Sequence, residues 1–115
     1  MSPAAFNDRS TPLALLLTRR SGKARDLIAP GPTPDQLATI LAAAARVPDH
    51  GKLAPWAFVI IDDRDALSAL LQRLYLADKP DAGRLELEAM DGFARQAPAL
   101  VALVSTPRPS HIPAW

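Results

Sequence analysis

Two short apolar runs, Ala57 to Ile61 and Ala99 to Val104, most constrain how this chain can fold. Each run is continuous and does not alternate with polar residues, as in strands that are covered on both faces. Because helical patterns separate the two runs, we expect helices packed around a central sheet. Two strands make a poor sheet, however, and both of these have the character of central strands. The pattern therefore predicts a sheet that further chain or a partner must complete.

Capping residues and apolar spacing predict four helices. The first follows Thr11-Pro12 and ends near Arg20. The second has the clearest start, Thr33 to Gln36, which combines a capping box with a proline at the first helical position. It should end around Arg46, because Pro48 disfavours helical backbone in the residue before it.

The remaining two helices lie between the predicted strands. One is expected to be capped by Asp62 or Asp63 and to break at Lys79-Pro80-Asp81. The other is expected from about Arg84 to Arg95. At the other end of the chain, the first residues have no regular pattern and predict a loose polar arm.

Charge and composition exclude several classes of protein. The 115 residues carry 13 Lys and Arg against 12 Asp and Glu, which argues against a dedicated nucleic-acid or membrane-surface binder. The absence of cysteine excludes disulfides, thiolate metal sites and a cysteine nucleophile. The early apolar run Leu13 to Leu17 is too short to span a membrane and lacks the flanks of a signal peptide. A cytoplasmic protein is the default expectation.

A first candidate site is the sequence Arg19-Arg20-Ser21 at the predicted end of the first helix. Guanidinium groups bind phosphate oxygens through forked donors and keep their charge, and a neighbouring hydroxyl adds a further donor. The alternative is that these arginines only complement the negative helix end and face water. A nucleotide-triphosphate loop is not expected, because Ala24 stands where serine or threonine would hold magnesium.

A second candidate site is the connection "RVPDHGKLAPW", residues 46–56, with Arg46 and His50. His50 could be a ligand, a proton donor or a hydrogen-bond partner for a polar ring. A metal site is not expected, because the only other histidine is His111 and no spaced carboxylates accompany the pair. The alternative is that His50 and Asp49 only satisfy backbone groups of the loop.

The two sites occur in an order that resembles a known family. The stretch "LLLTRRSGKARDLIAPGPTPDQLATILAAAARVPDHGKLAPWAFVII" resembles the N-terminal half of the FMN-dependent nitroreductase family, and its Pro-Asp-His loop resembles the small YdjA-like subgroup. "RQAPALVALVSTPRPSHIPAW" is similar to that subgroup's second strand and the Pro-x-Trp after it. On this resemblance, residues 1–12 are an N-terminal arm and residues 13–115 the N-terminal part of a nitroreductase-like domain. Ala54 departs from the pattern, which usually has glutamine before Pro-Trp.

The resemblance implies an α+β sandwich, with helices around a central sheet that is incomplete in this chain. It also implies a homodimer with FMN at the interface, NAD(P)H as electron donor, and a nitroaromatic, quinone or similar small acceptor in a ping-pong cycle. By position, Arg19, Arg20 and Ser21 would bind the FMN phosphate and ribityl chain. Arg46 and His50 would reach the FMN held by the other protomer. No side chain need act as a general acid or base.

A second hypothesis comes from a different class of protein. The same arginines and His50 could serve a non-catalytic α/β module that binds a phosphorylated ligand or a protein partner. The two readings differ in whether the protein holds a flavin.

Overall fold

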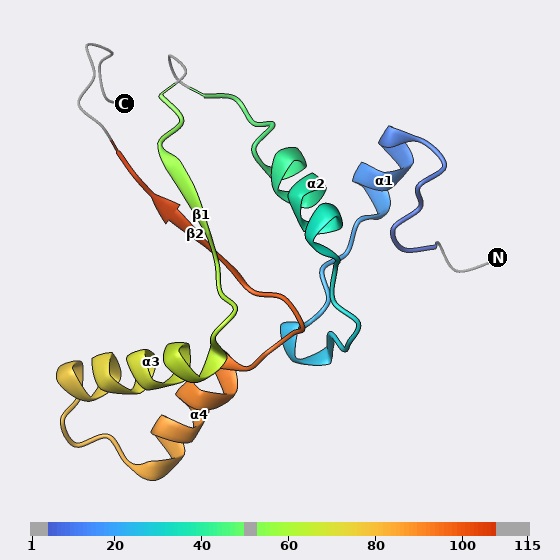
Figure 1. The fold of residues 1–115 in the computed structure, drawn as a ribbon. Helices are drawn as coiled ribbons and strands as arrows, with labels where there is room; N and C mark the ends of the chain where they lie inside the picture. The colour runs from blue at the N-terminus through green and yellow to red at the C-terminus, as the bar shows by residue number, and fades with distance from the viewer. Residues whose placement is uncertain (1–4, 50–52, 108–115) are drawn as a thin grey trace.

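The computed structural model describes residues 5–49 and 53–107 (Figure 1). Within these ranges the order of elements is α1 (Pro12–Thr18), the short 3-10 helix η1 (Ala24–Asp26), α2 (Pro34–Ala44), β1 (Trp56–Ile60), α3 (Arg64–Asp78), α4 (Arg84–Ala94) and β2 (Val101–Ser105). The expected helices and strands are confirmed, with ends that differ by about two residues, as is usual for such boundaries.

The helices begin where their capping residues predict. The Thr11 hydroxyl accepts the Ala14 N–H at 3.0 Å at the start of α1. At the start of α2, Thr33 and Gln36 form the reciprocal capping box. Of the two aspartates that could cap α3, Asp63 does so by accepting the Ala66 N–H at 2.9 Å. Local side-chain hydrogen bonds therefore fix these three starts.

The two strands pair with each other in antiparallel register, from Trp56 opposite Ser105 to Ile60 opposite Val101. Backbone hydrogen bonds extend the ladder by one residue at each end. The expectation that both faces are covered is not met within the described chain, because Val59 and Leu103 remain 49% and 70% exposed. The reason is that, in the described ranges, no helix packs extensively on either face of this two-stranded sheet.

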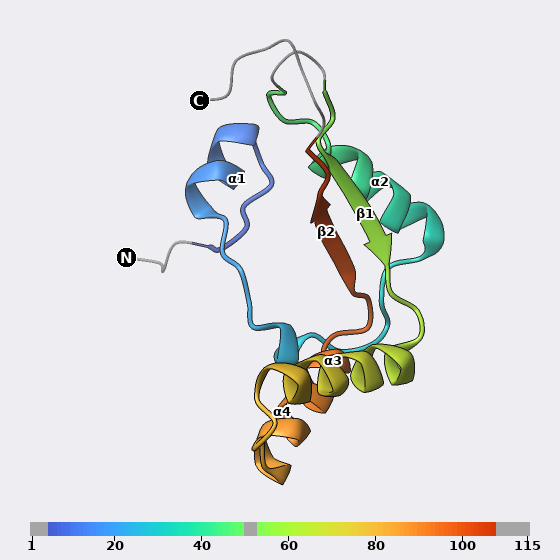
Figure 2. The ribbon, with the colours of Figure 1, turned by 90° about the vertical axis from the view of Figure 1, so that its left-hand side faces the viewer.

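A helical hairpin lies at one end of this ribbon, where α3 packs against α4 (Figure 2). The two buried residues of this hairpin are small: Ser68 on α3 is 3% exposed and Ala94 on α4 is 0% exposed. No larger side chain is fully buried among the described residues. Among the described residues, the hairpin therefore contains the most deeply buried positions.

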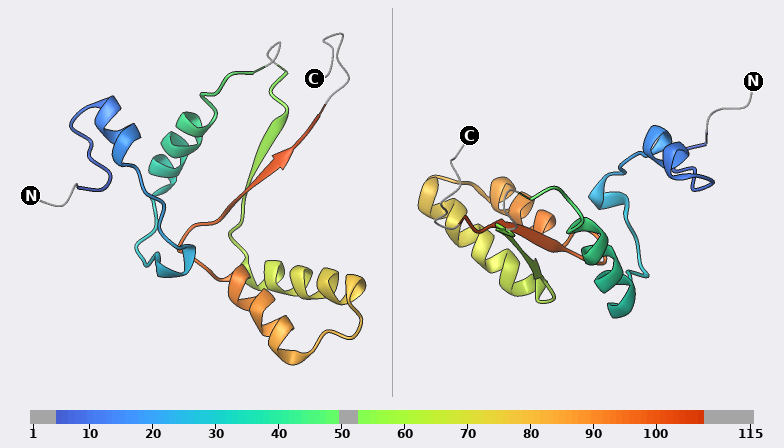
Figure 3. Two further views of the ribbon diagram at one scale, coloured as in Figure 1. Left: turned by 180° about the vertical axis from the view of Figure 1, so that it is seen from behind. Right: turned by 90° about the horizontal axis from the view of Figure 1, so that it is seen from above.

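The overall shape is open. The radius of gyration is 18.6 Å, whereas a compact domain of this length has about 13 Å. The accessible surface is 9657 Å², against roughly 6,100 Å² for a compact monomer of this mass. Figure 3 shows α1 standing apart from the sheet, and Leu16 and Leu17 on it are 75% and 76% exposed. The α+β fold is thus incomplete in this chain, as the sequence indicated.

Helix lengths also bear on membrane topology. Within the described ranges, no helix is both long enough and apolar enough to cross a bilayer.

Candidate functional site

The end of α1 presents the first candidate site. The helix stops at Thr18 because Arg19 adopts an extended backbone conformation as the C-cap residue. Arg19, Arg20 and Ser21 therefore follow the last helical turn and lie in the exposed chain beyond it. Both arginines face water, as the alternative expected, although they follow the last helical turn and do not lie within it.

The donors at this site have the chemistry that a phosphate requires. A guanidinium nitrogen of Arg19 lies 3.1 Å from the Ser21 hydroxyl oxygen and donates to it, so these two side chains act on the same region. In the part of the chain that the structure describes, no carboxylate forms an ion pair with Arg19 or Arg20. Two guanidinium groups and a hydroxyl fit the phosphate group of FMN in charge and hydrogen-bonding character.

Arg20 has neighbours that sequence reasoning missed. The Phe6 ring lies over its guanidinium, with 4.6 Å between Cζ and the ring centroid. The Asn7 side-chain oxygen accepts the Arg20 backbone N–H at 3.1 Å. The expectation of a loose arm over residues 1–10 is therefore wrong for Asn7 and Asp8, because polar groups of these two residues bind the end of α1. Only the tolerance of asparagine for turn conformations could have indicated this contact.

The second candidate site is described in part. Arg46 lies two residues beyond the end of α2 and is exposed. His50 lies outside the described residues. The Asp49 carboxylate accepts the Ala54 N–H at 2.7 Å, so this side chain satisfies a backbone group of the loop, as one alternative predicted. Ala54 itself has φ of 44°, in the left-handed region.

The structure does not bring the two sites together within one chain. Figures 1 and 2 both separate α1 from the end of α2 that leads to Arg46. Arg19 and Ser21 are joined by a hydrogen bond just after α1, whereas Arg46 follows α2 by two residues.

Two hollows lie along α2. An open groove of about 710 Å³ runs between α2, the end of β1 and the segment before β2, and its lining is mainly apolar, with Leu37, Leu41, Ile60 and Pro98. A smaller cavity of about 220 Å³ lies between the other end of α2 and the sheet, where Trp56 and Phe58 line it. Trp56, the first residue of β1, is partly buried beside this cavity. Neither hollow contains Arg19, Arg20 or Ser21.

Comparison with known proteins assigns the family. The model of the family described as "Nitroreductase family" matches residues 16–114. A Haemophilus influenzae protein named "Putative NAD(P)H nitroreductase" is 36% identical over 107 residues, which is 90% of this chain and 56% of that protein. The Escherichia coli K12 protein of the same name with the suffix YdjA is 35% identical over 106 residues, again 90% of this chain and 56% of the relative.

The chain belongs to the nitroreductase family. It spans only slightly more than half the length of these curated relatives. The match includes Arg19, Arg20, Ser21 and Arg46, and it begins after Phe6 and Asn7.

Proposed function

We propose that this chain forms part of an FMN-dependent NAD(P)H oxidoreductase of the nitroreductase type. Its acceptors are nitroaromatics, quinones or similar small molecules, reduced in a ping-pong cycle. The observation that carries the proposal is the donor set Arg19, Arg20 and Ser21, which lies exposed at the end of α1 within the family match. FMN, when bound, supplies the hydride chemistry, and the protein supplies binding, orientation and positive charge.

Each residue has a defined task in this proposal. Arg19 and Arg20 bind the FMN phosphate, and Ser21, already a hydrogen-bond partner of Arg19, binds the phosphate or the ribityl chain. Arg46 and His50 reach the FMN held by a second protomer. The separation of Arg46 from the α1 site in one chain supports this division of work between protomers.

The open shape supports the homodimer. Relative to a compact monomer, roughly 3,500 Å² of additional surface is exposed. Obligate homodimers bury about 2,000–5,000 Å² in total over both protomers, so a second protomer would cover part of this surface. The apolar face of α1 is the part of this surface that most clearly lacks a covering element in the described chain.

An absorption spectrum tests the proposal. The protein is expressed from its complete reading frame, incubated with FMN and desalted. A retained flavin band that NADH or NADPH bleaches without oxygen supports the oxidoreductase. A colourless protein overturns it, and retention of inorganic phosphate by that colourless protein would favour the non-catalytic module.

A pair of variants tests the site itself. Arg20→Ala should raise the FMN dissociation constant by about 10- to 100-fold, since a charge-assisted contact to phosphate is lost. Arg73→Ala is the matched control, because Arg73 is an exposed arginine on α3 that forms no ion pair in the described chain. Equal affinities of the two variants would contradict the assignment of Arg20.

A further inference from the structure

We propose that Phe6 and Asn7 are positioning residues that hold Arg20 in place for the cofactor phosphate. This inference rests on the proposed function, because it assigns a purpose to the arm in front of the same site. Phe6 and Asn7 precede the family match, which begins at residue 16.

The arm is fixed to the end of α1 by its backbone. The Asn7 N–H donates to the Thr18 carbonyl at 3.0 Å, and the Asp8 N–H donates to the Thr18 hydroxyl at 2.9 Å. The same hydroxyl donates to the Ala14 carbonyl at 2.7 Å. Thr18 thus anchors the arm directly before the arginine pair.

A turn within the arm directs two side chains back toward Arg20. Asn7 has φ of 56°, a left-handed conformation that asparagine adopts more readily than most residues. Its side-chain oxygen accepts the Arg20 backbone N–H, and Phe6, next to it, places its ring over the Arg20 guanidinium. One residue pair therefore restrains both the backbone and the side chain of Arg20.

The contact with Phe6 leaves donors of Arg20 for a ligand. The guanidinium lies over the Phe6 ring, with 4.6 Å between Cζ and the ring centroid. A guanidinium carries five N–H donors, more than one ring can occupy, so donors remain for a phosphate. Restraining a long side chain before binding reduces the conformational freedom that a ligand must otherwise remove. Phe6 is 64% exposed, so its ring adds little to a core and its clearest contact is with Arg20.

FMN affinity tests this role without reference to turnover. We expect Phe6→Ala to raise the FMN dissociation constant about five-fold, measured by quenching of flavin fluorescence on binding. Phe6→Tyr keeps an aromatic ring at this position and should bind FMN with the wild-type affinity. In the Arg20→Ala background, Phe6→Ala should have no further effect, because the group that it positions is gone.

Tyr75→Ala is the matched control. It removes the other cation–π contact of the described chain, in which Lys79 Nζ lies 5.2 Å from the Tyr75 ring centroid, at a site remote from Arg20 in sequence. This variant should keep the wild-type FMN affinity.

The outcomes separate this inference from the proposed function. A wild-type protein that binds no FMN overturns both. A wild-type protein that binds FMN, together with a Phe6→Ala variant of equal affinity, overturns the inference alone. So does a Phe6→Ala effect that persists in full in the Arg20→Ala background, since the residue would then act on the fold and not through Arg20.

Discussion

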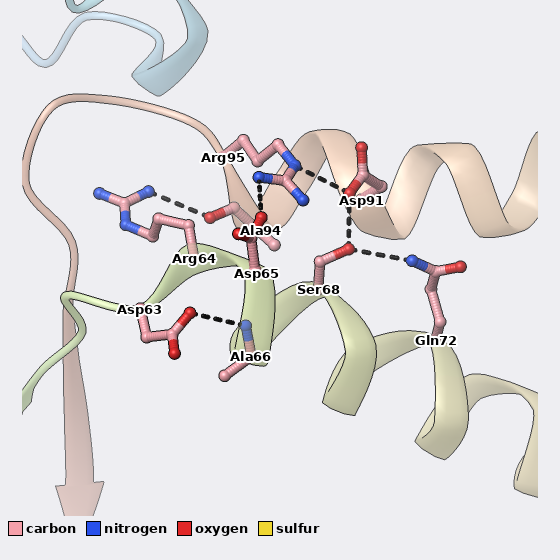
Figure 4. A network of polar contacts seen from close by, with 9 residues as sticks. All are labelled: Asp63, Arg64, Asp65, Ala66, Ser68, Gln72, Asp91, Ala94 and Arg95. Carbon is pink, nitrogen blue, oxygen red and sulfur yellow. Dashed lines mark hydrogen bonds and ion pairs between the residues drawn. The ribbon is translucent and has the colours of Figure 1, made fainter.

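The Ser68 hydroxyl donates a 2.6 Å hydrogen bond to Asp91 Oδ1 and so joins α3 to α4 through a buried polar group (Figure 4). Gln72 donates to the same hydroxyl, and Arg95 donates from the other side to the same Asp91 oxygen. Arg95 also forms an ion pair with Asp65 on α3 at 2.7 Å. The hairpin is thus held by a network of charged and hydroxyl groups around small side chains.

The network predicts a dependence of stability on pH. The Ser68 hydroxyl and, after it, Arg95 lower the pKa of Asp91 in the folded protein. Ionised Asp91 therefore contributes its full stabilisation above about pH 4, the pKa of an aspartate in the unfolded chain. This stabilisation is lost as the pH falls through the lowered pKa of the folded protein. Asp91→Asn should be less stable than wild type at pH 7 and should show a flatter decline below pH 4. Urea unfolding midpoints at both pH values measure this, and parallel wild-type and variant profiles would contradict it.

We expect Arg64, at the start of α3, to contribute to the stability of the protein through contacts with α4 and the segment after it. Its guanidinium donates to the carbonyls of Ala94, Gln96 and Ala97, at 2.8–3.1 Å, so it closes the end of α4 and the segment after it. Lysine cannot reach several carbonyls with a planar fork, so Arg64→Lys should cost about 2 kcal/mol in the free energy of unfolding. Arg73→Lys, on the exposed side of α3, is the control for loss of an arginine. Equal urea midpoints for the two variants would show that the carbonyl contacts contribute little.

Replacing Ala97 with glycine should stabilise the protein. Its φ of 60° lies in the left-handed region, which glycine adopts without the steric cost that a Cβ brings. Ala97→Gly should therefore raise the free energy of unfolding by about 1 kcal/mol. Ala99→Gly, two residues on and without a positive φ, should lower it. Thermal melts of both variants test the contrast, and a lower melting temperature for Ala97→Gly would count against it.

Two glycines should respond to alanine in opposite directions. A Cβ built at Gly31 lies 2.9 Å from the Pro98 Cβ, which is closer than real Cβ atoms approach, so Gly31→Ala should destabilise by about 1 kcal/mol. A Cβ at Gly92, within α4, meets nothing within 4 Å, and Gly92→Ala should stabilise by about 0.5–1 kcal/mol through helix propensity. Chemical denaturation of both variants and the wild type measures these changes in the free energy of unfolding. A tolerated Gly31→Ala would show that the loop before α2 does not contact Pro98 closely.

The proposed dimer predicts an effect of charge on α1. Leu17 is 76% exposed and belongs to the apolar face that we expect a second protomer to cover. Leu17→Lys should weaken dimerisation by about ten-fold or more, since a charge would lose its hydration on association. Sedimentation equilibrium at several concentrations measures the change. A wild-type protein that stays monomeric at high concentration would remove the basis of this prediction.

Local signals made much of the fold predictable. Thr11, Thr33 and Asp63 act within one turn of their helices. The sequence alone therefore located the first two starts and limited the start of α3 to Asp62 or Asp63. The apolar runs likewise identified both strands. The stop signal at Ser21-Gly22 predicted a helix that ends near Arg20, whereas α1 ends at Thr18.

Contacts between distant residues left no comparable signal. The hydrogen bonds from Arg64 to Ala94 and Ala97 span about 30 residues of sequence. From its local sequence, Arg64 is only an ordinary arginine in the first turn of a helix. The fit of Gly31 against Pro98 depends on where two loops meet. At the candidate site, Phe6 over Arg20 was missed for the same reason, because a single aromatic in a polar arm has no periodic pattern. The role of His50 stays a prediction, since that residue lies outside the described ranges.

The position of the α3–α4 hairpin between β1 and β2 has a consequence for the order of folding. Strand pairing must close a long loop, which is costly in chain entropy, whereas the two helices are neighbours in sequence and can meet first. Once formed, the hairpin brings Ile61 and Leu100, which are hydrogen-bonded in the structure, to the same place. We therefore expect the hairpin to nucleate the sheet. Ala94→Gly, which loosens the helix contact, should then slow refolding in stopped-flow experiments, and an effect confined to the unfolding rate would show that the strands meet without its help.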